Sequence, residues 1–85
     1  MYMLVYSEDA VRQLLQMRPV SNRESVIKIL ARLAGSPYQR GRFTVVDSTG
    51  RQNEVIVGSG FAITFWADHA VSEVRIMDIS RLPKP

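Results

Sequence analysis

The fold is decided by residues 52–66, which read QNEVIVGSGFAITFW. The turn sequence Gly58-Ser59-Gly60 separates two segments that are rich in β-branched and aromatic residues. The second segment alternates with the two-residue period of a strand that buries one face. The face predicted to be buried carries Phe61, Ile63 and Phe65. The stretch therefore predicts two antiparallel strands, 52–57 and 61–66, joined by a tight turn.

The same period continues on both sides of this hairpin. A strand is predicted over 42–48, followed by the turn Ser48-Thr49-Gly50. Another strand is predicted over 73–79, after a turn at Asp68-His69. Its two faces are expected to carry Val74 and Ile76 on one side, and Glu73, Arg75, Met77 and Ile79 on the other. Four strands joined by short turns predict an antiparallel sheet.

The first half of the chain begins with a strand and then changes to the helical period. Residues 2–6 form the predicted strand, and their apolar side chains on both faces are typical of an inner strand. Ser7 is placed to cap a helix, and the two acidic residues after it suit the positive end of the helix dipole. Pro19 ends this helix.

A second helix is predicted to begin at Ser21-Asn22-Arg23-Glu24, which has the spacing of a capping box. Gly35 is placed to end it. Only Pro19 and Val20 separate the two helices, so we expect an antiparallel helical pair. The apolar stripe of the second helix consists of Val26, Ile27, Leu30, Leu33 and Ala34.

The order of these elements predicts an α+β fold. An N-terminal strand and an antiparallel helical hairpin precede a four-strand antiparallel meander, and one curved sheet carries the helices on one face. Leu30 and Leu33 should be buried there against Phe61, Ile63 or Phe65. The other face is expected to be open wholly or in part, so a functional surface is expected on that face or along the sheet edge.

The composition is that of a small globular protein. The chain has 85 residues, room for a single domain over 1–85 with a tail at 82–85. It contains no cysteine, which excludes disulfides and cysteine-ligated zinc and makes the cytoplasm the expected location. No apolar segment reaches the roughly 18 residues of a membrane span, and the apolar start lacks a signal-peptide pattern. We expect no membrane partner and no cofactor.

Charge is distributed unevenly along the chain. The net charge is +3, but residues 12–51 hold eight basic residues against two acidic ones, a balance of +6. A basic middle segment attracts polyanions or an acidic protein partner. The same residues also suit two solvated helix faces, and the sequence leaves both interpretations open.

Few residues of the chain suit catalysis. His69 is the only histidine, which excludes a multi-histidine metal site, and its place beside Asp68 in a predicted turn favours a solvated turn residue. No metal is expected. The arginines on or near the sheet suit bidentate phosphate binding and can stabilise charge on a phosphoryl group. These are Arg40, Arg42, Arg51, Arg75 and Arg81. Trp66, on the face opposite the phenylalanines, suits either a partner contact or packing.

Four segments resemble the RelE/ParE toxins of type II toxin–antitoxin pairs, a plasmid-stabilisation-like superfamily. They read YSEDA (6–10), ILARLAGSPY (29–38), VGSGFAITFW (57–66) and VRIMDI (74–79). The resemblance covers about residues 2–80 and lies in the pattern and order of the elements. It implies a strand and a helical hairpin that lead into a curved sheet.

The resemblance also implies a toxin-like protein that binds a cognate antitoxin. Members of the RelE branch cleave messenger RNA on the ribosome and so inhibit translation. The catalytic candidates that this sequence offers as partial substitutes for the residues of that branch are Arg51, Arg75, Arg81 and His69. The nucleic-acid-binding candidates are Arg40, Arg42 and Arg51. The apolar anchors for a partner are Trp66 and Met77, which are predicted to lie outside the helix-covered face.

The sequence departs from the RelE pattern at several positions. Glu54 and Ile56 stand where that branch carries basic residues, and Ala62 stands where an arginine is expected. Arg81 is not followed by the tyrosine of the RelE branch. Since arginine is a poor proton acceptor, His69 or a carboxylate would have to act as the general base.

These departures leave alternatives to an active ribonuclease. One is a non-nuclease member of the same scaffold, either a ParE-like inhibitor of DNA gyrase or an inactive protein that binds an antitoxin. Another is a free-standing RNA-binding domain, although the basic residues are diffuse and the phenylalanines are predicted to be buried.

Overall fold

The hairpin predicted within residues 52–66 forms as strands β3 (Gln52–Gly58) and β4 (Phe61–Asp68), in a computed structural model that describes residues 1–83. Ser59 and Gly60 both have positive φ angles, 53° and 82°. Two such residues form a tight turn whose twist matches that of the flanking strands. The strands are antiparallel, with Ile56 opposite Ile63. The predicted hairpin is confirmed.

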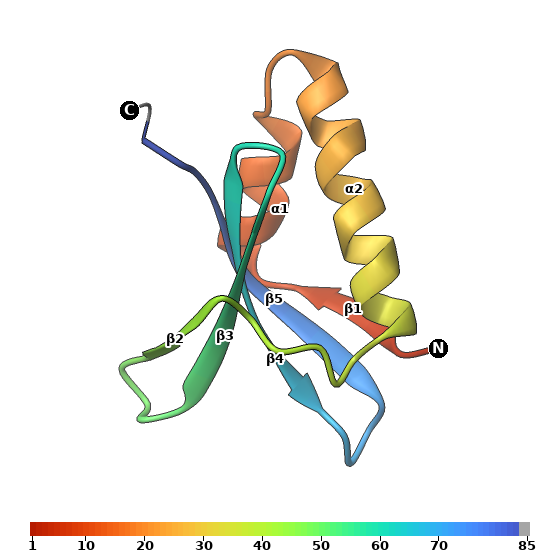
Figure 1. Cartoon of the computed structure of the whole chain (residues 1–85), viewed down its shortest axis with the longest axis vertical. Coiled ribbons are helices and arrows are strands. Elements are labelled where there is room, and N and C mark those ends of the chain that lie inside the picture. Colours follow the sequence, from red (N-terminus) through yellow and green to blue (C-terminus); the bar gives the residue numbers. More distant parts are fainter. Residues whose placement is uncertain (84–85) are drawn as a thin grey trace.

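Three further strands complete a five-stranded sheet: β1 (Met3–Tyr6), β2 (Phe43–Val46) and β5 (Glu73–Arg81) (Figure 1). The spatial order is β1-β5-β4-β3-β2. Strands β2 to β5 form the predicted antiparallel meander, whereas β1 pairs with β5 in parallel. The α+β fold is confirmed, and the sheet as a whole is mixed.

Strand β1 lies at the edge of the sheet, so its predicted inner position is wrong. Apolar residues on both faces of a strand show that both faces are covered, not that both edges are paired. Leu4 packs against the core, whereas Val5 lines a hollow that Met77 also borders. Both sides of β1 are thus partly covered without a second neighbouring strand.

Helix α1 (Glu8–Leu15) begins at the predicted cap. The Ser7 hydroxyl accepts a hydrogen bond from the Ala10 amide at 3.0 Å. The helix ends at Leu15, four residues before Pro19. The chain between the two helices is therefore longer than the two residues that the sequence suggests.

Helix α2 (Val20–Gly35) begins without the predicted capping box. Pro19 occupies the N-cap position, and Val20 is already helical, so the Ser21 side chain lies inside the first turn. A hydroxyl at that position cannot bond an amide of the first turn as a cap does. Arg23 instead ties α2 to α1, because its guanidinium donates to two carbonyls at the end of α1, each at 2.8 Å. The predicted end of α2 at Gly35 is confirmed.

The core lies between the helices and one face of the sheet. Leu30 and Leu33 of α2 are at most 1% exposed. They belong to the same buried cluster as Phe61, Ile63 and Phe65 of β4, which confirms the predicted contact layer. Burial of large aliphatic and aromatic side chains is the main favourable term in the folding of so short a chain.

Strand β5 contains an irregularity that brings Ile79 into the core. Its pairing with β4 skips Met77 at the step between Thr64 and Phe65. An extra residue of this kind changes the alternation of faces along the strand. Ile79 is therefore buried in the core cluster, and its predicted position on the open face is wrong.

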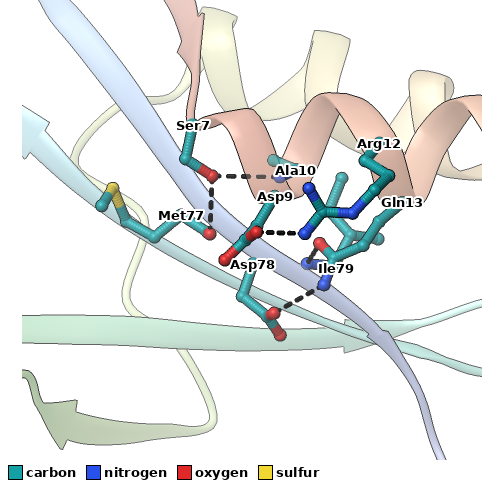
Figure 2. Close-up of polar contacts among 8 residues, drawn as sticks. All are labelled: Ser7, Asp9, Ala10, Arg12, Gln13, Met77, Asp78 and Ile79. Atoms are coloured by element: carbon teal, nitrogen blue, oxygen red, sulfur yellow. Dashed lines mark hydrogen bonds and ion pairs between the residues drawn. The ribbon is translucent and has the colours of Figure 1, made fainter.

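Side chains of Ser7 and of helix α1 form hydrogen bonds to the backbone of β5 where β5 extends past the end of β1 (Figure 2). Strand β1 pairs with only the first four residues of β5. Beyond them the Ser7 hydroxyl donates to the Met77 carbonyl at 2.8 Å. The side-chain oxygen of Gln13 accepts a hydrogen bond from the Ile79 amide at 2.6 Å. Side chains of α1 thus take the place of a longer β1.

No helix within residues 1–83 has the length and apolar character needed to cross a membrane. The predicted tail begins at Leu82, whose amide donates to the Gly60 carbonyl at 2.9 Å and so attaches it to the β3–β4 turn. The last two residues of that tail, 84–85, lie outside the described residues.

Candidate nucleic-acid and partner interface

Trp66 lies opposite Arg75 in the pairing of β4 with β5, on the face that carries no helix. It is half-buried and stands outside the core cluster. The guanidinium carbon of Arg51 is 3.8 Å from the centre of a Trp66 ring, and that of Arg75 is 5.5 Å away. Both distances allow cation–π attraction. We call Arg51, Trp66 and Arg75 the Trp66 surface.

The two arginines of this surface differ in whether a carboxylate neutralises their positive charge. Arg75 donates to Glu73 at 2.7 Å. Its Nε atom is buried and has no hydrogen-bond partner within residues 1–83. Arg51 has an exposed side chain that forms no ion pair in the described part of the chain. Arg51 therefore offers the uncompensated positive charge of the Trp66 surface.

The β2–β3 turn positions Arg51. The Asp47 carboxylate accepts hydrogen bonds from the backbone amides of Thr49 and Arg51, at 2.9 and 3.0 Å, and from the Asn53 side chain at 3.0 Å. The Thr49 hydroxyl and then the Asn53 side chain lower the pKa of Asp47 to about 2, so Asp47 is ionised at neutral pH. A charged carboxylate thus fixes the backbone at the base of Arg51.

Two hollows border Trp66. The first has a volume of about 210 Å³ and is lined by Val5, Tyr6, Met77 and the Trp66 surface. Met77 is 38% exposed, since it is the residue that the pairing with β4 skips. The two predicted partner anchors, Trp66 and Met77, therefore border one hollow. We call it the Met77 hollow.

The second hollow shares Arg51 and Trp66 with the first and has a volume of about 350 Å³. Arg40 and His69, two of the predicted site residues, also line it. Glu54 adds a carboxylate, one oxygen of which accepts a hydrogen bond from the backbone amide of Gly41 at 2.7 Å. We call this the His69 hollow. It combines positive charge, an aromatic wall and the only histidine of the chain.

Two tyrosines hold His69 at the border of its hollow. The Tyr2 hydroxyl lies 2.9 Å from His69 Nδ1, and the Tyr38 ring stacks on the His69 ring with centroids 4.4 Å apart. Tyr38 also raises the pKa of Tyr2 above its usual value, with desolvation as the next cause. Neither tyrosine is among the sequence-predicted site residues. Tyr2, Tyr38 and His69 lie far apart in the sequence and come together only in the folded chain. No local sequence pattern therefore predicts their contact.

Arg42 and Arg81 do not join the Trp66 surface. Arg42 precedes β2, and its exposed side chain forms no hydrogen bond or ion pair within residues 1–83. Arg81 lies six residues beyond Arg75 on β5, roughly 20 Å at the rise of a strand. Its guanidinium donates to the Arg18 carbonyl at 3.2 Å and lies 5.1 Å from the centre of the Phe61 ring. The predicted arginines are therefore divided between separate places.

The fold has counterparts among solved structures, although no protein-family model and no curated protein matches the sequence. The chain is similar to the isolated RelE toxin of E. coli, with a TM-score of 0.75 and 17% identity over 100% of this chain and 88% of that chain. It is also similar to a chain of the intact E. coli RelBE toxin–antitoxin complex, with a TM-score of 0.71 and 17% identity over 99% and 100% of the two chains. The chain has the fold of RelE, as the four resembling segments predict.

Proposed function

We propose that this chain is the toxin component of a type II toxin–antitoxin pair and that it inhibits translation by cleaving messenger RNA on the ribosome. One observation carries the proposal: on a RelE-like fold, the Trp66 surface and the His69 hollow adjoin and combine arginines, aromatic rings and a histidine. Arginines bind phosphates, and exposed aromatic rings stack on the splayed bases of single-stranded RNA.

Each group has a role in the proposed cleavage. The RNA 2′-oxygen attacks the adjacent phosphorus and the bond from phosphorus to the 5′-oxygen breaks, which leaves a 2′,3′-cyclic phosphate and a 5′-oxygen that takes a proton from water to become a hydroxyl. His69 accepts the proton of the 2′-hydroxyl, because arginine is always protonated and cannot. Arg40 and Arg51 stabilise the negative charge that develops on the phosphoryl oxygens. Trp66 stacks on a base beside the cleaved bond.

Expression of the chain alone is the direct test. We expect growth to stop on induction, with methionine incorporation lost before thymidine incorporation, because translation fails first. Mapping of transcript ends should then reveal new cuts inside translated messages. Normal growth on induction, with the folded chain present, would contradict the proposal.

Charge reversal at Arg51 tests the site itself. Arg51→Glu should abolish toxicity, because it removes the uncompensated charge of the Trp66 surface. The melting temperature should hardly change, since an exposed cation–π contact contributes only about 0.5–1 kcal/mol. Lys28→Glu makes the same charge change on an exposed position of α2 and should leave toxicity intact. Equal toxicity of the two variants would remove Arg51 from the site.

A second candidate function is a non-nuclease role on the same scaffold, as a ParE-like inhibitor of DNA gyrase or as an inactive antitoxin-binding protein. Arg81 favours this role, because its contacts with the Arg18 carbonyl and Phe61 keep it away from the Trp66 surface. Glu54 favours it as well, since a carboxylate that lines the His69 hollow repels a phosphate. Loss of thymidine incorporation first, unaffected by His69→Ala, would select the gyrase route.

A further inference from the structure

The imidazole of His69 has two nitrogen atoms, and the fold holds only one of them. Nδ1 lies 2.9 Å from the Tyr2 hydroxyl. Nε2 lies on the other side of the ring and forms no hydrogen bond within residues 1–83. A neutral imidazole carries one proton, and the nitrogen without that proton is the acceptor. The contact with Tyr2 therefore decides which nitrogen of His69 can act as a base.

Tyr2 is a fixed partner for this contact. Its ring packs against the core cluster, and its backbone amide donates to the Ala34 carbonyl at the end of α2, at 3.0 Å. The amide of the next residue, Met3, donates at 3.0 Å to the carbonyl of Ser72, which belongs to the same β4–β5 turn as His69. The backbone of Tyr2 and the turn that carries His69 are thus held in place relative to each other.

Tyr38 determines the direction of the hydrogen bond between Tyr2 and His69. A hydroxyl has a single proton, although its oxygen can also accept. The largest cause of the raised pKa of Tyr2 is a side-chain hydrogen bond with Tyr38. A hydrogen bond raises the pKa of a hydroxyl when it favours the protonated form, that is, when the hydroxyl donates. The proton of Tyr2 is therefore directed to Tyr38, and the oxygen of Tyr2 accepts from His69 Nδ1.

The charge of the His69 hollow acts in the same direction. Arg40 and Arg51 line the hollow, against the single carboxylate of Glu54. Positive surroundings favour a nitrogen lone pair over an N–H group. The hollow therefore favours Nε2 without a proton and Nδ1 with one.

We propose that Tyr2 is the positioning residue of His69: its hydroxyl oxygen holds the imidazole proton on Nδ1 and so makes Nε2 the atom that accepts the proton of the RNA 2′-hydroxyl. This inference rests on the proposed function, because it assigns the general base of that cleavage to one nitrogen. When Nε2 takes the proton, Nδ1–H stays bonded to Tyr2. The Tyr38 ring, stacked at 4.4 Å, stabilises the imidazolium by cation–π attraction. Tyr2 itself neither gives nor takes a proton in the step.

Nitrogen-15 NMR tests the tautomer without RNA, and the signals are unambiguous because His69 is the only histidine. At about pH 8.5, above the ordinary titration range of imidazole, the proton should reside on Nδ1 in the natural chain. Tyr2→Phe keeps the ring but removes the hydroxyl, so the proton should redistribute towards Nε2. Tyr6→Phe removes a hydroxyl at the far end of β1 and should leave the tautomer unchanged. A proton on Nε2 in the natural chain, or an unchanged tautomer in Tyr2→Phe, would overturn the inference.

Cleavage of a defined message on purified ribosomes tests the consequence. Tyr2→Phe should lower kcat by roughly tenfold or more and leave KM unchanged, because Tyr2 acts through His69 and does not line the hollow. His69→Ala should lower kcat further, and Tyr2→Phe added to His69→Ala should cause no additional loss. A normal kcat for Tyr2→Phe, or an additional loss in the double variant, would show that Tyr2 does not act through His69.

The two measurements separate this inference from the proposed function. A natural chain that cleaves messages but carries the proton on Nε2 would overturn the inference and leave the proposed function standing. A natural chain that carries the proton on Nδ1 but cleaves no message would overturn the proposed function, and the role of Nε2 as base with it.

Discussion

Two strands of the sheet, β5 and β3, extend beyond their outer neighbours, β1 and β2. The two extensions differ in whether their backbone groups are hydrogen-bonded. Strand β5 continues past the end of β1, and Ser7 and Gln13 of the α1 region satisfy its backbone (Figure 2). Strand β3 continues past the end of its pairing with β2, and nothing within residues 1–83 satisfies the outer edge at Val57. An unpaired edge is a site at which another chain can add a strand. The closed edge stabilises the fold, and the open edge is available for a partner.

Chain connectivity explains the difference. Helix α1 follows β1 directly, so its first turns pass along the extension of β5. The segment before β2 instead crosses β3 at Gly41 and turns away. A Cβ atom on Gly41 would lie only 2.5–2.8 Å from backbone atoms of Val55, so only glycine permits this crossing. Within residues 1–83, no helix or strand follows the edge of β3 beyond the crossing.

The largest effect is expected when the core between α2 and the sheet is weakened. This core holds α2 in place beside the open edge of β3. Leu30→Ala should cost about 2–5 kcal/mol of unfolding free energy, because Leu30 is 1% exposed and its removal leaves a cavity. Ile27→Ala is the matched control, since Ile27 lies on the same helix but is 47% exposed. Urea unfolding measures both. A cost at Leu30 no larger than at Ile27 would contradict the packing of α2.

A smaller effect is expected at the closed edge. Gln13→Ala should cost about 1–3 kcal/mol, because the partly buried amide of Ile79 loses its acceptor. Exchange of the Ile79 amide should become faster, while exchange at Val57 stays rapid as before. Gln16→Ala removes an exposed glutamine that ends the same helix and should change neither quantity. Unchanged exchange at Ile79 would show that Gln13 does not close this edge.

The sequence predicts the elements well because local period and turn chemistry determine them. The alternation in β4 and the glycine turn are such signals, and so is the apolar stripe of α2, of which Ile27 alone is exposed. The errors arise where tertiary contacts override a local rule. Pro19 starts α2 before Ser21 can cap it, and the residue skipped in β5 brings Ile79 into the core. The edge position of β1 depends on a parallel pairing with the last strand, which no local pattern reveals.

The candidate site could be predicted only in part, for the same reason. Arg51 and Trp66 belong to neighbouring strands of the predicted meander, so a sequence reading places them on one sheet. Tyr38 comes from the segment after α2, and its stacking on His69 requires that segment to return over the sheet. The open edge at Val57 depends on where β2 begins, which is decided by the crossing at Gly41. Neither the stacking of Tyr38 on His69 nor the open edge at Val57 can be predicted from residue types alone.

The smallest effect concerns Asp47, whose turn joins β2 to β3 and holds the register of their pairing. The pKa of Asp47 is lowered from 3.8 to about 2, first by the Thr49 hydroxyl. A carboxylate with a lowered pKa stabilises the fold at pH values above 3.8, and this contribution is lost as the pH falls towards 2. Asp47→Asn should therefore lower the melting temperature slightly at neutral pH, and its difference from the natural chain should vanish near pH 2.

Thr49→Val separates this mechanism from a general weakening of the turn. It keeps the shape of the side chain and the backbone amide but removes the hydroxyl that contributes most to the low pKa of Asp47. The NMR titration of Asp47 should then move upward towards 3.8, and acid destabilisation should begin at a higher pH. Amides of β2 should exchange faster, whereas the Ile79 amide at the closed edge should not change. An Asp47 titration that stays near 2 in this variant would show that other groups fix the turn and that the register of β2 does not depend on this hydrogen bond.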